Sequence, residues 1–225
     1  LFNIHYFDWS RYWLDKAIEN KNWSTEAGTL PFLIDSWIKS NTPKYGDGWH
    51  SYTSSLRIRN WIWLFLFCPD LITRKRTSSI WYQICWLRSR PESHHGGNHW
   101  LENLISLCFG GIVFDSKLSD YIFKYAIKNL EKELTLQILN DGGHEERTAS
   151  YHILILDRLT ELGCILIIYE RIVPKWLNQK INEMLGWLKN IRLINNNYPI
   201  FNDCSKESCG DFNDIYFFAK GFLQK

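Results

Sequence analysis

The sequence has little net charge and no dense block of charge of one sign. Its 26 Lys and Arg residues almost balance its 24 Asp and Glu residues, so the formal net charge is +2. The basic run Arg74-Lys75-Arg76 is short, and such runs are usually solvated loops. We therefore expect no nucleic-acid partner.

Long hydrophobic runs are also missing. The longest, Trp61 to Cys68, is stopped by Pro69-Asp70 and is too short to cross a bilayer, so we expect no membrane span. The chain starts at Leu1 without a basic region or a signal-like apolar run. We expect that an N-terminal piece is missing.

The six cysteines form no CxxC pair, and four of them lie inside apolar runs, where Cys acts as a small hydrophobe. Cys204 and Cys209 can form a local bridge or remain thiols. A zinc site built from His94, His95, His99 and Glu102 is disfavoured, because Gly96-Gly97 interrupts the helix that would align these side chains. We predict no metal.

Alternating strand patterns are almost absent, and the best candidate, Tyr198 to Phe201, contains Pro199. Long amphipathic stretches bounded by Gly, Pro, Asn or Asp predict helices instead. Their spacing favours an all-α fold of stacked antiparallel helical hairpins. The predicted helices are Ser55 to Cys68, Thr77 to Arg88, Trp100 to Phe114, Lys117 to Leu139, Ser150 to Tyr169 and Lys175 to Leu193.

Against this background the chain carries many aromatic side chains and two polar segments. Aromatic residues make up 16% of the chain, including 12 Trp, and flat apolar rings suit a carbohydrate cleft as well as a core. The segments Gly96 to Asn103 and Asp141 to His152 each place glycines ahead of amide, imidazole, carboxylate or phenol groups. These groups are suited to removing a proton beside a carboxylate.

In the first segment, a helix that starts at Asn98 or His99 would place four polar side chains close together at its N-terminal end, namely Asn98, His99, Glu102 and Asn103. The alternative is a stabilising cap made by Asn98 with Glu102. That alternative requires neither His99 nor Asn103.

In the second segment, Gly142-Gly143 is expected to open a helix that carries Glu146, Arg147, Tyr151 and His152. Arg147 would then lie one turn from Tyr151, where a cation favours the ionised phenol that a base near neutrality needs. The alternative is an Arg stem that packs on a Tyr ring at the surface.

A third group comprises Trp49-His50 and Arg57. Arg57 can bind a sugar carboxylate or sulfate with two hydrogen bonds, and Trp49 or Trp61 can stack on a sugar ring. A buried Trp beside a surface Arg explains the group equally well.

Taken together, these motifs resemble the heparinase II/III-type polysaccharide lyases, including related alginate lyases. The resemblance rests on Gly97-Asn98-His99 with Glu102-Asn103, and on Asp141-Gly142-Gly143-His144 with Glu146-Arg147 and Tyr151-His152. It also includes three further segments, Phe2–Asp8, Trp49–Trp61 and Pro199–Asp203.

The resemblance implies an incomplete α/α toroid over residues 1–200, with residues 201–225 beginning a linker toward a C-terminal β-sandwich that is absent here. It implies β-elimination on a uronic-acid polysaccharide in the periplasm or outside the cell, with no cofactor. Asn98 and His99 would neutralise the uronate carboxylate, Tyr151 would be the proton acceptor and donor, and Glu102 would orient His99. Expected substrate contacts are Glu102, Asn103, Trp49, His50, Arg57, Glu146, Arg147 and His152.

The chain departs from the family pattern at Glu145, where an aromatic is usual, and at Thr148-Ala149, where Ser-Pro is usual. Two other functions stay open beside the lyase. One is a catalytically inactive, carbohydrate-binding relic of such a lyase. The other is an α/α-barrel glycoside hydrolase that uses Glu102 and Glu146 as its two carboxylates.

Overall fold

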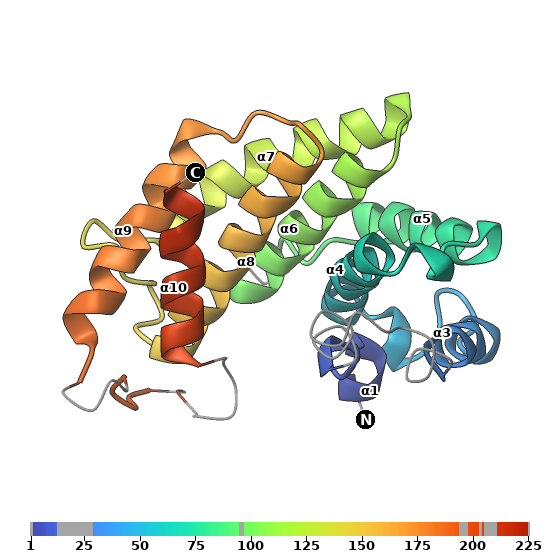
Figure 1. Cartoon of the computed structure of the whole chain (residues 1–225), viewed down its shortest axis with the longest axis horizontal. Coiled ribbons are helices and arrows are strands. Elements are labelled where there is room, and N and C mark those ends of the chain that lie inside the picture. Colours follow the sequence, from blue (N-terminus) through green and yellow to red (C-terminus); the bar gives the residue numbers. More distant parts are fainter. Residues whose placement is uncertain are drawn as a thin grey trace. The chain divides into compact units, whose positions relative to one another are not determined.

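The structure, a computed structural model, describes residues 2–12, 29–94, 97–193, 198–202, 204 and 211–224 (Figure 1). Within these ranges every regular element is a helix, and the pairing of Ile138 with His144 is an isolated bridge. The chain forms two compact units. Unit 1 comprises residues 1–95 and 106–123, and unit 2 comprises residues 96–105 and 124–225, so α6 and α7 contribute to both.

Unit 1 is built around α4 (Ser51–Phe67), most of whose residues are buried. Helices α1 (Phe2–Tyr6) and α5 (Arg74–Ser89) pack on α4, and α3 (Thr29–Ser40) packs on α5 (Figure 1). Two short 3-10 turns, Asp47–Trp49 and Pro69–Leu71, flank α4. Because α4 is covered on several sides, its buried residues are not confined to one stripe, and they include polar side chains as well as apolar ones.

The buried guanidinium of Arg57 joins the helices of unit 1. Its Nε donates to Gln83 Oε1 at 2.8 Å, its Nη1 to the His5 carbonyl at 3.1 Å and its Nη2 to Ser54 Oγ at 3.3 Å. Its carbon Cζ lies 3.9 Å from the ring centre of Trp37. A buried cation needs such partners, so Arg57 is a structural residue and does not present its charge at the surface.

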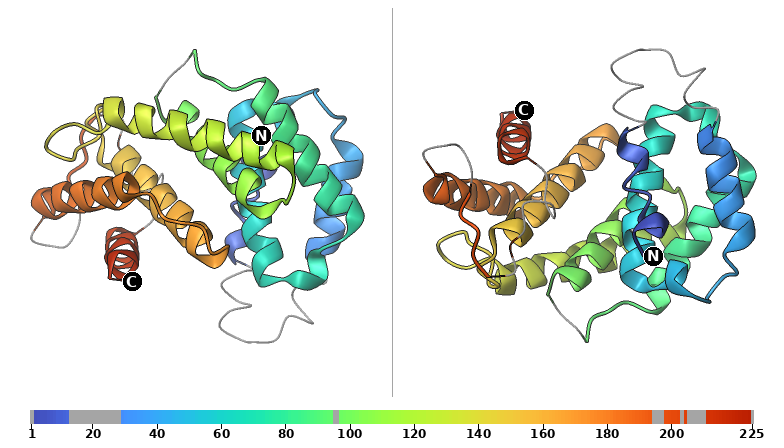
Figure 2. Two further views of the ribbon diagram at one scale, coloured as in Figure 1. Left: turned by 90° about the horizontal axis from the view of Figure 1, so that it is seen from above. Right: turned by 90° about the horizontal axis from the view of Figure 1, so that it is seen from below.

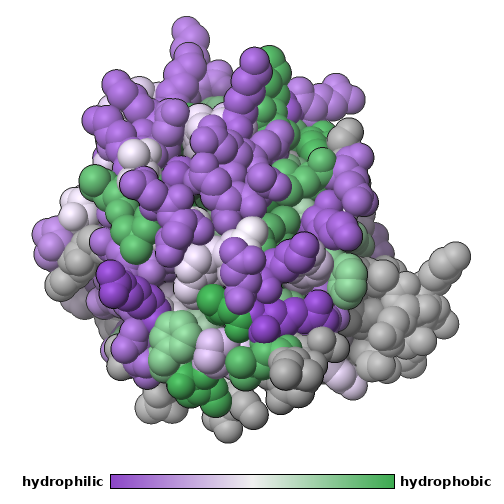
Figure 3. Space-filling model, turned by 90° about the vertical axis from the view of Figure 1, so that its left-hand side faces the viewer, coloured by the Kyte–Doolittle hydropathy of each residue, from purple (hydrophilic) through white to green (hydrophobic). Residues whose placement is uncertain are grey.

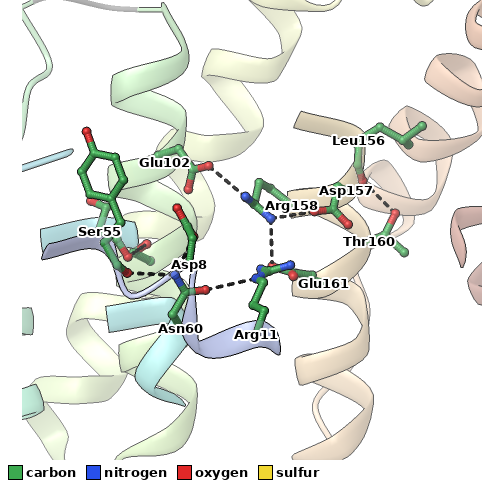
Figure 4. Close-up of polar contacts among 12 residues, drawn as sticks. Asp8, Arg11, Ser55, Asn60, Glu102, Leu156, Asp157, Arg158, Thr160 and Glu161 are labelled. Atoms are coloured by element: carbon green, nitrogen blue, oxygen red, sulfur yellow. Dashed lines mark hydrogen bonds and ion pairs between the residues drawn. The ribbon is translucent and has the colours of Figure 1, made fainter. Parts of the chain in front are cut away.

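Asn60, one turn further along α4, holds the chain that leaves α1. Its Nδ2 donates to the Tyr6 carbonyl at 2.9 Å and to Asp8 Oδ1 at 2.7 Å, and its Oδ1 accepts from Arg11 Nε at 3.3 Å (Figure 4). The sequence motifs Phe2 to Asp8 and Trp49 to Trp61 therefore pack against each other. Their residues meet because α1, only five residues long, depends on contacts with α4 for its stability.

Unit 2 contains the first part of α6 (Gly97–Val113), most of α7 (Lys117–Gln137), and then α8 (Ala149–Ile168), α9 (Lys175–Ile191) and α10 (Phe212–Leu223). Helix α8 packs against both α9 and α10 (Figure 2). The buried residues of α9 recur at three- and four-residue steps, which gives one apolar stripe. They are Leu177, Ile181, Met184, Leu185 and Leu188.

The six predicted helices are confirmed, with ends that differ by a few residues. Three further helices, α1, α3 and α10, lie in segments where the sequence predicted none. Residues 201–225, expected to begin a linker, contain α10, whose N-cap Asp211 accepts from Asn213 N and Asp214 N. Its buried Phe212, Ile215, Ala219 and Phe222 pack on α8 and α9. Tyr198 to Phe201 forms no strand.

The side of the molecule on which α9 lies in Figure 1 is mainly hydrophilic, with apolar side chains in small groups (Figure 3). Among the described helices, none is long and apolar enough to cross a bilayer. Cys204 is a thiol, and its proposed partner Cys209 lies outside the described residues.

Candidate functional site

The second polar segment begins with a tight turn rather than a helix. Gly142 has φ of 85°, and its N–H donates to the Leu139 carbonyl at 2.9 Å. Gly143 N donates to Asp141 Oδ1 at 2.9 Å. A Cβ atom on Gly142 would lie 2.2 Å from the Glu183 carbonyl oxygen of α9. The turn therefore needs glycine both for its left-handed backbone and for its contact with α9.

Helix α8 starts close to the predicted Ser150 and not at the glycines that were expected to open a helix. Arg147 has φ of 49°, Thr148 is extended as the N-cap, and the helix runs from Ala149. The expected one-turn spacing of Arg147 and Tyr151 is therefore wrong, since Arg147 lies outside the helix. Tyr151 lies in the first turn of α8 and is half-buried.

The first polar segment starts α6 one residue earlier than expected. Gly97, with φ of 59°, is the first residue of α6, and Asn98 and His99 follow inside the first turn. Asn98 is thus not the N-cap residue of this helix, which is the position that the alternative of a cap made with Glu102 requires. Both Asn98 and His99 are half-buried.

The two polar segments meet in unit 2. Gln137, the last residue of α7, donates from Nε2 to the Gly97 carbonyl at 3.1 Å. A Cβ atom on Gly97 would lie 3.4 Å from Glu146 Oε1. The first residue of α6 is therefore adjacent to the loop that leads into α8. Asn202 adds a third segment, because its Nδ2 donates to the Arg147 carbonyl at 2.8 Å.

A buried ion pair joins α6 and α8 further along both helices. Arg158 Nε lies 3.0 Å from Glu102 Oε1, with side chains 9% and 0% exposed, and Arg158 Nη1 lies 2.6 Å from Asp157 Oδ2 (Figure 4). Asn98 precedes Glu102 by four residues, and Tyr151 precedes Arg158 by seven. At about 1.5 Å per residue, both lie on the N-terminal side of the pair, by about 6 Å and about 10 Å along their helices.

Asn98 and His99 thus lie in the first turn of α6, and Tyr151 lies in the first turn of α8. The segments that begin these two helices are adjacent in unit 2. Glu102 lies deeper, and its carboxylate is paired with Arg158. The structure therefore gives Glu102 a role in joining two helices, and the expected substrate contact of this buried side chain is not found. Asn103 is also fully buried.

His152 is a core residue, which differs from its expected place at the substrate. It is 0% exposed, its Nε2–H donates to the Met184 carbonyl at 3.0 Å, and its ring centre lies 4.4 Å from that of Trp187. Because Tyr151 and His152 are consecutive on a helix, their side chains diverge by about 100°. Anchoring His152 on α9 fixes the rotation of α8 and therefore the direction of Tyr151.

The third predicted group lies in unit 1. Trp49 is 5% exposed and packs on Trp37, so neither ring face is available to a sugar. Arg57 is buried, as described above, whereas the sequence suggested a surface cation. His50 is the exposed member, and its Nδ1 lies 3.7 Å from Glu92 Oε1.

Sequence reasoning did not find Gln137 or Arg158, the residues that join the two motifs. Each lies inside or at the end of a long helical pattern, where a polar residue usually marks a solvated face. Among the described residues, no cluster of three or more His, Cys, Asp or Glu side chains is arranged to hold a metal ion.

Two buried histidines should make the protein less stable in acid. Burial lowers the pKa of His144 to about 4 and that of His152 to about 3, from 6.5. The unfolded chain therefore takes up these protons first, and stability is lost as pH falls below 6.5. We expect the free energy of unfolding to be about 4 kcal/mol lower at pH 5 than at pH 8.

Denaturant titrations at several pH values measure this loss. His144→Gln should remove about half of the pH dependence, because one of the two groups no longer titrates. The control, Thr135→Ser, changes an exposed residue that does not titrate and should leave the slope unchanged. Equal slopes for wild type and His144→Gln would contradict the expectation.

Comparison with known proteins identifies a family and several similar structures. The model of the heparinase II/III N-terminus matches residues 32–220. The structure superposes on heparinase III with a TM-score of 0.74 at 18% identity, covering 89% of this chain and 33% of that one. It superposes on heparan sulfate lyase HepC from Pedobacter heparinus with a TM-score of 0.62 at 20% identity, over 89% and 33% of the two chains. No curated protein gives a significant match.

The "Heparinase III-BT4657 gene product" is also similar, with a TM-score of 0.68 at 18% identity, over 98% of this chain and 39% of that one. These likenesses show an all-α fold of the incomplete α/α toroid class. The chain belongs to the heparinase II/III N-terminal family. It spans about a third of the length of the solved heparinases that it matches.

Proposed function

We propose that this chain is the helical part of a polysaccharide lyase that cleaves a uronic-acid polymer by β-elimination. Asn98 and His99 neutralise the uronate carboxylate, and Tyr151 moves the proton. The observation that supports this most is the meeting of two segments 40 residues apart, through the Gln137 bond to Gly97. Asn98 and His99 follow Gly97 directly, and Tyr151 lies one turn past the loop that touches it.

The chemistry explains why these groups are needed together. The proton on carbon 5 of a uronate is barely acidic while the adjacent carboxylate is charged. Amide and imidazole donors on the carboxylate stabilise the enolate-like charge that develops there. Tyr151, as tyrosinate, removes the proton, and the electron pair forms the C4=C5 double bond as the C4–O4 bond breaks. The phenol then returns its proton to O4.

The buried pair of Glu102 and Arg158 supports elimination over hydrolysis. A glycoside hydrolase would need Glu102 and Glu146 as two carboxylates facing a sugar. Glu102 is fully buried and paired with Arg158, so it is not available to protonate a leaving group or to activate water.

The family and the names of similar solved structures support the choice of substrate class. Heparinase III and heparan sulfate lyase HepC are named for acidic polysaccharides. We assign an acidic, uronate-containing polysaccharide to this chain, and a periplasmic or extracellular location in which such a polymer is met. The chemistry above requires no cofactor.

The test is to mix the protein with a panel of uronate polymers, sulfated and non-sulfated, and to follow ultraviolet absorbance of the unsaturated product. We expect absorbance to rise with at least one polymer, with one double bond formed for each new reducing end. Binding without turnover would identify a carbohydrate-binding protein instead. New reducing ends without absorbance would identify a hydrolase.

A further inference from the structure

A continuous set of hydrogen bonds links the two polar segments through side chains that the proposed chemistry does not use. Glu146 N donates to His144 Nδ1 at 3.3 Å, and His144 Nε2 lies 3.1 Å from Gln137 Oε1. Gln137 Nε2 lies 3.1 Å from the Gly97 carbonyl and 2.7 Å from Glu133 Oε1. We call Gln137 and His144 the relay pair; both are 1% exposed.

The partners of the relay pair allow one arrangement of protons. A backbone N–H can only donate, so His144 Nδ1 must accept from Glu146 and carries no hydrogen. His144 is then neutral with its hydrogen on Nε2, and it donates to Gln137 Oε1. The amide NH₂ of Gln137 is left to donate to the Gly97 carbonyl and to Glu133, which are both acceptors. Every hydrogen bond of the pair is satisfied in this arrangement and in no other.

Backbone hydrogen bonds hold the relay pair in place on the loop side. Glu145 N donates to the Gln137 carbonyl at 2.8 Å, and Leu139 N donates to the Gly143 carbonyl at 2.8 Å. The loop therefore folds back onto the end of α7, and His144 is brought against Gln137 by the main chain. Gln137 extends the contact to Gly97, the residue that precedes Asn98 and His99.

We propose that Gln137 and His144 are positioning residues that fix the start of α6 relative to the start of α8, and so hold Asn98 and His99 in register with Tyr151. This inference rests on the proposed function, because it concerns the geometry of the same site. Neither residue touches the substrate. Losing the relay should lower kcat more than it raises KM, because carboxylate neutralisation and proton transfer strengthen in the transition state.

Two substitutions of His144 separate this role from simple packing. In His144→Gln the side-chain amide reaches about as far as Nε2 and can still donate to Gln137. In His144→Asn the shorter amide reaches only the position of Nδ1. It can accept the hydrogen bond from Glu146 N but cannot donate one to Gln137 Oε1. Both replace imidazole by an uncharged amide, so their cost to folding should be similar.

We expect kcat to fall about 10²-fold in His144→Asn, as a displacement of about 1 Å can cause, with KM changed less than threefold. His144→Gln should lose less than tenfold. Gln137→Leu should behave like His144→Asn, and the matched change Gln179→Leu, at an exposed glutamine on α9, should behave like wild type. Equal kcat in His144→Asn and His144→Gln would overturn the proposal.

A second measurement does not depend on turnover. In uniformly ¹⁵N-labelled protein, nuclear magnetic resonance should show the proton of His144 on Nε2, and the amide signals of Asn98 and His99 should shift in His144→Asn but not in His144→Gln. A proton on Nδ1, or unmoved amide signals in His144→Asn, would overturn the relay. If wild type cleaves no uronate polymer while these signals behave as expected, the proposed function fails and the relay stands.

Discussion

Tyr151→Phe should abolish polymer cleavage, lowering kcat by about 10²- to 10⁴-fold, the range that general acid–base groups contribute. The phenol oxygen is the proposed carrier of the C5 proton, and phenylalanine keeps the ring but removes that atom. Because Tyr151 is half-buried in the first turn of α8, loss of one hydroxyl should leave the fold intact. Initial rates of the rise in ultraviolet absorbance measure cleavage, and circular dichroism checks that the fold is intact.

The matched control for this substitution is Tyr169→Phe. Tyr169 follows the other end of the same helix and is the C-cap of α8, so it lies far along the helix from the proposed site. We expect its rate to equal that of wild type. Cleavage that persists in Tyr151→Phe would remove Tyr151 from the mechanism, whereas equal losses in both variants would point to a general effect on α8.

Arg158→Met should destabilise the protein by about 3–5 kcal/mol. Glu102 is 0% exposed and lies 3.0 Å from Arg158 Nε, and removing one partner of a buried pair leaves an uncompensated charge. Asp157 and Glu161, at 2.6 and 3.7 Å from Nη1, lose the same cation. The melting temperature should fall by about 10 °C for a chain of this size, measured by calorimetry or thermal circular dichroism.

A double substitution distinguishes the cost of the unpaired charge from a loss of packing. Replacing both partners, Arg158→Met with Glu102→Leu, should recover part of the lost stability, because apolar groups can replace a buried ion pair at little cost. The recovery should be incomplete, since Asp157 and Glu161 still lack their cation. Arg171→Met, at an exposed position, is the control and should change stability by less than about 0.5 kcal/mol. A loss below about 1 kcal/mol in Arg158→Met would show that the pair does not hold α6 to α8.

The sequence predicted the long helices well because their information is local. The stripe of Leu177, Ile181 and Leu188 recurs with the helical period, and Pro174 stands immediately ahead of α9. Such patterns act within one or two turns and require no knowledge of the neighbours. The family resemblance had the same origin, since its motifs are short and contiguous.

Elements that depend on distant partners were not predicted. Helix α1 is five residues long and is held by Arg57 and Asn60, which follow it by about 50 residues. Helix α10 starts after a segment rich in turn-forming residues, and its apolar face gains its stability from α8 and α9. Short helices are only marginally stable alone, so the sequence of such a segment is as compatible with a loop as with a helix.

For the candidate site, the sequence by itself determined which chemical groups are present and in which two segments they lie. Only the tertiary structure decided their use, because burial and pairing depend on residues far along the chain. It placed Arg57, Trp49 and His152 in the interior, paired Glu102 with Arg158, and brought Gly97 against Gln137 and the loop before Tyr151. A polar side chain in a sequence has no fixed role until its partners are known, since desolvation must be balanced by specific contacts.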